Sequence, residues 1–337
     1  MNGQTLIVYM KNDIITVSAG IIYQKEFSGK EIQDIAKEVA QDVAAEPLLT
    51  GLAYVACPGG VLKPLKKGCY FINEKAVKDL ADSSFGNHPY NRLTILAYEI
   101  GIQCGFKAIM LYPMSCDELL PVNRCTSYAG IKKYSRYHAM EHHMGLRYLC
   151  DISGKRLEDM NCIIAFIDDL VSVGAYGRGM CLDVNDCIGA EGPMGLTSSG
   201  DVPVAQIAGY FIEKCSSFAE MEEQLMHHGG ICQYTGITDM EELDQQYNND
   251  ECVKAACEGL AYQTAKWIGS SVLVLQGKVD YILLMGKAMK SRALQKLLTM
   301  RVEKIAQVLL LDESETEQYI KEEVKILGTN GCPVYDY

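Results

Sequence analysis

The sequence predicts an α/β fold made of two domains of similar size. Strand-like and helix-like segments alternate in both halves of the chain, which is typical of sheets flanked by helices. At 337 residues the chain is longer than one hydrophobic core normally supports. A polar linker, CDISGKRLEDMN near 150–161, separates a helical stretch from a run of strands. We therefore expect one domain at 1–150 and a second at 151–311.

The elements of the first domain follow from hydrophobic periodicity. Apolar runs around a Lys-Asn-Asp turn in TLIVYMKNDIITVSAGIIY predict a β-hairpin or meander. Apolar residues recur at helical spacing in SGKEIQDIAKEVAQDVAAEP, where Ser28 and Glu31 predict a capping box. LAYVACPGG and KAIMLYP are expected to be buried strands, with helices at about 89–103 and 134–149.

The second domain repeats this alternation. CIIAFIDDLVSVGAYGRG, residues 162–179, predicts a β-hairpin that closes on Gly-Arg-Gly. A capped helix is expected at 217–228 and a long helix at about 251–275. The apolar segments VDYILLMG and QVLLL predict strands, and ESETEQYIKEEVKILG predicts a final helix.

Charge and hydropathy exclude several classes of partner. The net charge is −12 and no local basic patch is evident, which argues against nucleic acid and anionic membranes as partners. No apolar run approaches the 18 or so residues of a membrane span, and the N-terminus does not read as a signal peptide. We expect a cytoplasmic protein.

Cysteine is abundant, with 14 residues, but no pair has CxxC spacing. Without a secretion signal, the expectation is reduced cysteines that act as small core hydrophobes. A metal or redox role is the alternative.

Several segments occur in the order of a known family. They are SVGAYGRGMCLDVNDCIGAEGPMGLTSSGDVPV, GGVLKPLKKGCYFIN, GNHPYN, DELLPVNR, YHAM, GGICQYTGITD, AYQTAKWIG and GKVDYILLMG. Together they resemble the butyrate kinase branch of the acetate kinase family, within the sugar kinase, Hsp70 and actin superfamily. Most are weak alone, and the resemblance depends on their collinearity over nearly the whole chain.

The resemblance implies a two-domain actin-like ATPase (ribonuclease H-like) fold. Two mixed five-stranded sheets flanked by helices would face a central cleft with nucleotide between them, and the C-terminal helix, about 312–337, would pack on the first domain. The family passes phosphate between ATP and a short-chain carboxylate, so an active member would use Mg-ATP. The resemblance also implies a homodimer, or a hetero-oligomer with an active relative.

Two phosphate loops depart from the family pattern. In the hairpin at 162–179, Asp168 and Asp169 stand where the family has glycines. A carboxylate 4 Å from a phosphate charge costs about 4 kcal/mol at an effective dielectric of 20. The pair is therefore either a solvated acidic tip or, with Mg²⁺ bound, a metal site. The first loop, VYMKNDIIT, has lost its glycine, and Lys11 is a possible substitute cation.

Further family residues are replaced at the positions that bind the carboxylate substrate and at those that bind the nucleotide. Pro58 stands where the family has an arginine, and Tyr112 stands where it has a catalytic aspartate. Ser198 replaces a second arginine, and Lys287 replaces a glycine of the adenosine site. Loss of one cation that stabilises the transferring phosphoryl group removes several powers of ten in rate.

Other positions keep the family residue. The catalytic remnants are His138, which in the family donates toward the phosphoryl group, and Glu313, at a position implicated in magnesium binding. The resemblance assigns cofactor contacts to Ser172, Gly174, Glu191, Gly192 and Gly286. It assigns a substrate pocket to Gly59, Gly60, His88, Asn91 and Pro193.

Three functions remain open from the sequence. The favoured one is a non-catalytic family member, a binding, regulatory or oligomer-forming subunit that needs no cofactor. The second is a divergent kinase for a short-chain fatty acid such as butyrate. The third is a metal-dependent hydrolase, because His138, Glu141 and His142 spell H-x-x-E-H, an inverted zinc-peptidase motif. No third metal ligand is identifiable.

Overall fold

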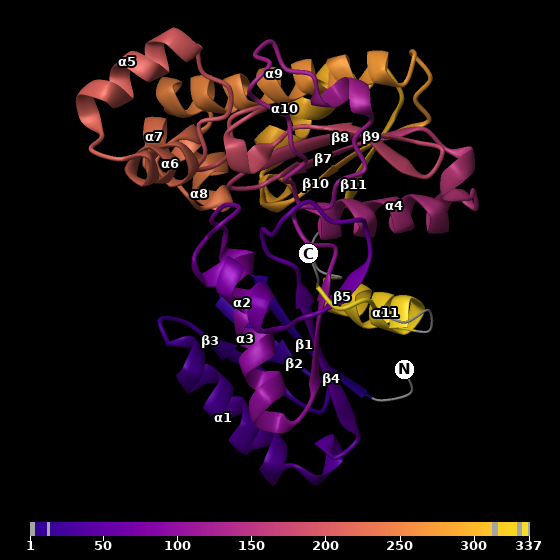
Figure 1. Cartoon of the computed structure of the whole chain (residues 1–337). Coiled ribbons are helices and arrows are strands. Elements are labelled where there is room, and N and C mark those ends of the chain that lie inside the picture. The colour runs from indigo at the N-terminus through magenta and orange to yellow at the C-terminus, as the bar shows by residue number, and fades with distance from the viewer. Residues whose placement is uncertain (1–3, 12–13, 312–315, 329–331, 336–337) are drawn as a thin grey trace. The chain divides into compact units, whose positions relative to one another are not determined.

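The computed structural model describes residues 4–11, 14–311, 316–328 and 332–335, which form two compact units (Figure 1). The first unit is Met1–Asp117 with Ser314–Tyr337, and the second is Glu118–Glu313. The division after Asp117 differs from the expected boundary near 150. The reason is that helix α4 (Ala139–Ser153) packs on strands β7 and β10 of the second unit, so the residues before the linker belong there.

The first unit is a sheet with helices on both faces. Its elements are β1 (Gln4–Lys11), β2 (Ile14–Ser18), β3 (Gln24–Phe27), α1 (Ile32–Ala45), β4 (Leu52–Pro58), β5 (Cys69–Phe71), α2 (Glu74–Ala81), α3 (Pro89–Cys104), β6 (Lys107–Leu111) and α11 (Thr316–Gly328). The predicted capping box is wrong, because α1 begins at Ile32 and the Glu31 side chain makes no capping hydrogen bond.

The second unit contains the remaining elements. They are α4, β7 (Cys162–Ile167), β8 (Val171–Gly177), β9 (Met180–Val184), α5 (Val204–Lys214), α6 (Phe218–His227), α7 (Gly230–Thr235), α8 (Met240–Gln246), α9 (Glu251–Val274), β10 (Tyr281–Met285), α10 (Arg292–Val302) and β11 (Gln307–Leu311). The hairpin, the long helix α9 and the two late strands confirm the sequence predictions.

Both sheets are mixed and share one strand order. The second sheet runs β11-β10-β7-β8-β9, and the first runs β3-β2-β1-β4-β6-β5. In each, an antiparallel meander is followed by two parallel strands, and β5 adds an antiparallel sixth strand to the first sheet. The expected five-stranded arrangement is therefore repeated in both units, but the first sheet has one strand more.

Period-two alternation decides what each sheet face packs against. In β1, Leu6 and Val8 belong to the hydrophobic core that includes residues of α1 and α3. The intervening side chains, Ile7 and Tyr9, point to the opposite face, and α11 contacts β1 and β4 there. Figure 1 shows α11 beside this sheet, next to β5.

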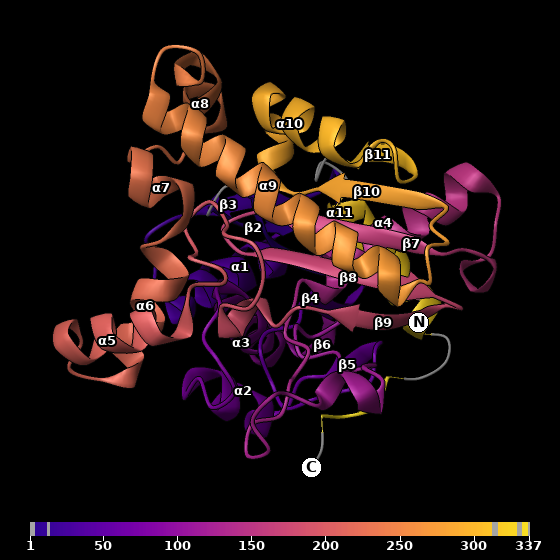
Figure 2. The same cartoon turned by 90° about the horizontal axis from the view of Figure 1, so that it is seen from above.

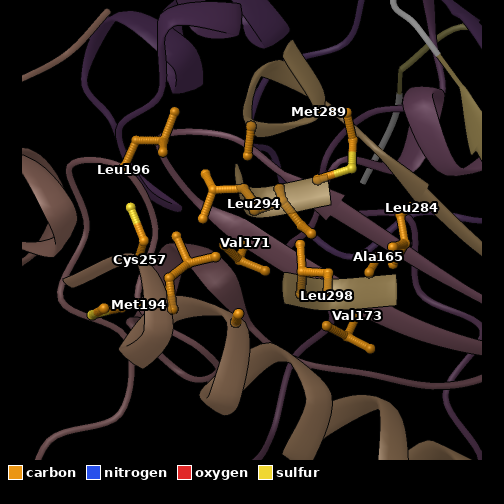
Figure 3. Packing of buried hydrophobic residues seen from close by; sticks show 14 of the residues in the cluster. Ala165, Val171, Val173, Met194, Leu196, Cys257, Leu284, Met289, Leu294 and Leu298 are labelled. Carbon is orange, nitrogen blue, oxygen red and sulfur yellow. The ribbon is translucent and has the colours of Figure 1, made fainter. Parts of the chain in front are cut away.

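The second core lies between one face of the sheet and helices α9 and α10 (Figure 2). Side chains such as Ala165, Val171, Val173 and Leu284 interdigitate there with Leu294 of α10 (Figure 3). Helix α4 contacts β7 and β10 on the other face, where Gly145 lies against Leu283 and Ile164.

One cysteine pair departs from the expectation of reduced thiols. Cys69 on β5 and Cys332 form a disulfide, and the other twelve cysteines are free. Among the helices that the structure describes, none is long and apolar enough to cross a membrane.

Candidate functional site

The candidate site of the second unit is built on the β7–β8 hairpin. The strands are antiparallel, with Phe166 opposite Ser172. Val171, Val173 and Ala175 face the α9 core, so the alternate residues Ser172, Gly174 and Tyr176 face α4. The hairpin thus presents a hydroxyl, a glycine and a phenol to one helix.

Two histidines of the α4 region meet these residues. His138 is the N-cap residue of α4, and its ring Nδ1 lies 3.2 Å from Ser172 Oγ. One turn later, His142 Nε2 lies 2.9 Å from the same oxygen, and its Nδ1 lies 2.9 Å from the Tyr176 hydroxyl. The His138 ring also packs on Phe166 at 4.4 Å between centroids. A continuous chain of hydrogen bonds links Tyr176 to His138.

Burial makes this chain electrically neutral. Desolvation, with a smaller contribution from the neighbouring imidazole, lowers the pKa of His138 to about 3, and it lowers the pKa of His142 to about 3. Desolvation also raises the pKa of Tyr176 far above its ordinary value. A neutral imidazole donates through one nitrogen and accepts through the other, so these groups orient one another and carry no positive charge at pH 7.

The H-x-x-E-H motif does not form a metal centre in this arrangement. Both ring nitrogens of His142 lie at hydrogen-bond distance from hydroxyls. Within the described ranges, no group of three or more His, Cys, Asp or Glu side chains is placed to hold a metal ion. Asp168 and Asp169, the predicted metal ligands, belong to no such group of three in the part of the chain that the structure describes.

The hairpin tip is docked against the following loop. The carbonyl oxygens of Asp168 and Asp169 accept hydrogen bonds from the amides of Leu196 (2.9 Å) and Ser198 (3.0 Å). A Cβ on Gly195 would lie 2.0 Å from the Asp169 carbonyl oxygen, so only glycine fits there. Both aspartates are half-buried, and Asp168 Oδ1 accepts from the Asp169 amide at 2.8 Å.

The glycines assigned to the cofactor make room for the protein itself. A Cβ on Gly174 would lie 3.0 Å from the His142 ring. Gly286 has φ +100°, and a Cβ there would lie 2.6 Å from the Ile167 carbonyl oxygen. Each glycine has a packing reason that requires no ligand. Lys287 follows at the start of a 3₁₀ turn, Lys287–Lys290, and is half-buried.

Glu191 and Gly192 belong to a loop held by Asn185. The Asn185 side chain is fully buried, accepts from the Val173 amide (2.7 Å), and donates to the Glu191 carbonyl (2.7 Å). The Glu191 carboxylate accepts from the Asp186 amide and forms an ion pair. Burial raises the pKa of Glu191, and the charge of its partner Lys133 opposes that rise.

The first unit brings four predicted pocket residues together. Asn91 Oδ1 accepts from the Val61 amide at 2.8 Å, and a Cβ on Gly60 would lie 2.6 Å from the same oxygen. Gly59 packs on the Pro113 backbone. His88 is the N-cap residue of α3, where its Nδ1 accepts from the Tyr90 amide.

Not every predicted residue joins a site. Pro193 is buried and belongs to the second unit, whereas the other four residues of its predicted set belong to the first. Lys11 is exposed at the end of β1. Glu313 lies outside the described residues.

Two tyrosines of the first unit contact the C-terminal helix. The Tyr9 hydroxyl donates to Glu317 at 3.4 Å, and Ser18 donates to the same carboxylate at 2.7 Å. The Tyr112 hydroxyl donates to Glu323 at 3.1 Å in a buried environment. Burial, together with the charge of Glu323, raises the pKa of Tyr112. Tyr9 and Tyr112 are thus both hydrogen-bonded to α11.

Three residues were not anticipated from the sequence. Thr94 accepts from the Gly60 amide and donates to the Pro58 carbonyl, and Asn185 and Tyr176 act as described above. Each of the three is a polar residue within a largely apolar segment, and this pattern could have indicated a buried hydrogen bond. Their hydrogen-bond partners lie elsewhere in the chain, and hydrophobic periodicity does not identify them.

Comparison with known proteins identifies similar chains. A sequence model of the acetokinase family matches residues 113–313. A propionate kinase from Francisella tularensis subsp. tularensis SCHU S4 superposes with a TM-score of 0.78 at 13% identity, over 95% of this chain and 98% of that one. Acetate kinase from Porphyromonas gingivalis gives 0.75 at 14% identity, over 97% and 99%. Entamoeba histolytica acetate kinase gives 0.74 at 13%, over 96% and 99%. These similarities confirm the actin-like ATPase fold.

Proposed function

This chain belongs to the acetokinase family, and from that premise we propose that it is a carboxylate kinase-like protein that no longer transfers phosphate. In this proposal it serves as a binding, regulatory or oligomer-forming subunit. Because the sequence resembles the butyrate kinase branch of this family, we propose that the protein descends from a butyrate kinase.

One observation carries the proposal: side chains at the family's catalytic positions are bonded to other parts of their own unit. Tyr112 replaces the catalytic aspartate, and its hydroxyl is bonded to Glu323. A phenol with a raised pKa, held by a carboxylate, is a poor substitute for an ionised aspartate. His138 is retained, but it is buried and uncharged, so it supplies no cation to a phosphoryl group.

The residues present also fit Mg-ATP poorly. The second phosphate loop offers two carboxylates, and its backbone carbonyls are engaged with the Leu196–Ser198 segment. Gly286 is close-packed on Ile167. A phosphate chain needs N–H donors, whereas the amides of Asp168 and Asp169 already donate to the Leu170 carbonyl and to Asp168 Oδ1. We therefore assign no phosphoryl-transfer step to these residues.

A subunit role needs a contact surface, and α5 with the start of α6 offers one. Val204 is 80% exposed, Ile212 82% and Phe218 67%. Helix α5 carries no charge from Val204 to Ile212, and it lies at the outer edge of its unit in Figures 1 and 2. The occupant we propose is a second copy.

The absence of charge along α5 favours this arrangement. An antiparallel pairing of two α5 helices covers the uncharged stretch from Val204 to Ile212 in both copies. Light scattering after size exclusion tests it. We expect a dimer for the native chain and a monomer for Ile212→Glu. Ile102→Glu on α3, a position 63% exposed, is the matched control and should remain dimeric. A native monomer would refute this contact.

Nucleotide binding tests the loss of catalysis. Calorimetry with ATP and ADP, with and without Mg²⁺, should give no heat up to millimolar nucleotide, while an active family member titrates normally. Trapping with hydroxylamine should detect no acyl phosphate from acetate, propionate or butyrate. Magnesium-dependent binding together with a trapped product would refute the proposal and establish a divergent carboxylate kinase, the second candidate.

A double variant, Asp168→Asn with Asp169→Asn, separates two explanations. If the carboxylates repel phosphate, the variant gains weak nucleotide affinity that the native chain lacks. If they hold Mg²⁺, the native chain binds and the variant does not. The first result supports a non-catalytic protein and the second contradicts it.

A further inference from the structure

We propose that Cys69 and Cys332 form a reversible thiol–disulfide exchange site that locks helix α11 onto the first sheet. The site is independent of nucleotide or substrate. Its natural reactant is a dithiol in the reducing direction and a low-molecular-weight disulfide in the oxidising direction.

The disulfide joins the chain end to the edge of the sheet. Cys69 lies on β5 and is buried, whereas Cys332 is half-exposed. Their Cα atoms are 5.5 Å apart, although 263 residues separate them in sequence. Because Cys69 is buried and Cys332 is half-exposed as a residue, we place the attack of an external thiolate at Cys332.

The residues after Cys332 continue the attachment along β5. The Phe71 amide donates to the Pro333 carbonyl at 2.9 Å, and the Tyr335 amide donates to the Phe71 carbonyl at 3.2 Å. The Tyr335 hydroxyl donates to Asp79 on α2 at 2.9 Å, with the tyrosine 1% exposed. The chain end is therefore an added strand segment with a buried aromatic anchor.

Helix α11 ends at Gly328, only a few residues before Cys332. The helix also packs on the sheet through its buried residues Tyr319, Ile320 and Val324, and it accepts hydrogen bonds from Tyr9, Ser18 and Tyr112. These non-covalent contacts can open and close, whereas the disulfide cannot open without a chemical reaction. Breaking the covalent link therefore increases the opening of the whole α11 attachment.

The other cysteines indicate that the bond is reversible. Twelve remain free, and Cys125 and Cys252 among them are exposed. In a chain that also carries a disulfide, exposed thiols reshuffle with it under lasting oxidation, so this composition suits a reducing compartment. A single disulfide in such a chain opens and closes with the thiol pool.

The exchange proceeds in two thiol–disulfide steps. One thiolate of the dithiol attacks Cys332 Sγ and forms a mixed disulfide, while Cys69 leaves as a thiolate and takes up a proton. The second thiolate of the reductant then attacks its own mixed-disulfide sulfur and releases Cys332, which also takes up a proton. The dithiol loses two electrons and becomes a cyclic disulfide, and the two protein sulfurs gain those electrons.

The test combines disulfide mapping with hydrogen exchange on the full-length protein. Protein purified under glutathione buffer should yield a Cys69–Cys332 peptide in non-reducing digests. Dithiothreitol should then raise exchange in peptides covering 316–328 by about tenfold or more, with α9 peptides unchanged. Cys332→Ser should exchange fast with or without reductant. Cys125→Ser, the matched control, should keep the native redox response.

Two results would overturn the proposal. One is that Cys69 and Cys332 are both alkylated as free thiols after equilibration with excess glutathione disulfide. The other is a mapped disulfide whose reduction leaves exchange at 316–328 unchanged. If Cys332→Ser is insoluble, Cys69→Ser and reduced native protein supply the same comparison.

Discussion

Acidification should destabilise this protein through the two buried histidines that contact Ser172. Both have a folded-state pKa near 3, against an ordinary value of 6.5, because burial disfavours the charged imidazole. A pKa lowered in the folded state means that the unfolded chain binds protons first as pH falls. Stability contributed by these neutral histidines is therefore complete above about pH 7 and decreases as pH falls from 6.5 toward 3.

The size of the effect follows from linkage. At pH 5.5 an unfolded histidine of pKa 6.5 carries about 0.9 proton, while each buried one carries almost none. Integrated from pH 7.5 to 5.5, each histidine removes about 1.4 kcal/mol from the free energy of unfolding, and the pair removes about 2.7 kcal/mol. Most carboxylates titrate below this window, so they contribute little to the difference.

The assay is urea denaturation at pH 7.5, 6.5 and 5.5 for the native chain and for His142→Gln. Glutamine can donate to one neighbouring hydroxyl and accept from the other, and it does not titrate. The variant's loss between pH 7.5 and 5.5 should be smaller than the native loss by about 1.4 kcal/mol, whatever its absolute stability.

Equal losses in the native chain and His142→Gln would refute the reasoning, because they would mean that His142 has the same protonation in both states.

Three further substitutions test the packing of the site by urea denaturation at pH 7.5. Gly286→Ala should lose at least about 2 kcal/mol, because its Cβ would lie 2.6 Å from the Ile167 carbonyl at φ +100°. Tyr112→Phe should lose about 1–2 kcal/mol, since it removes a buried hydrogen bond to Glu323. Asn185→Ala should lose about 3 kcal/mol, because three backbone groups lose their partner. A loss below about 0.5 kcal/mol in any of them would contradict the assigned contact, since that is the range of neutral surface changes.

Local elements were largely predictable from the sequence. The hairpin 162–179, the long helix near 251–275 and the strand VDYILLMG all appear where periodicity placed them. Alternation in β8 also implies that Ser172 and Tyr176 share a face. The spacing of hydrophobic residues shows which face of a helix or strand is buried. It is a local property of each segment, so it can be seen in the sequence alone.

The domain boundary shows where local information ends. The linker near 150–161 is polar, and this led to a boundary there. The structure instead assigns α4 to the second unit, because that helix packs on β7 and β10. A polar stretch marks exposure, and an exposed loop can connect two elements of one unit as readily as two domains.

The sequence alone indicated the family and the alternation of strands and helices, and it predicted that catalytic positions such as Tyr112 are replaced. Only the tertiary structure decided which groups these side chains meet. The hydroxyl of Tyr112 bonds to Glu323, Ser172 lies between His138 and His142, and Cys69 pairs with a cysteine 263 residues away. The physical reason is that these contacts join groups from separate elements of a unit, and no periodicity within one segment specifies its partner.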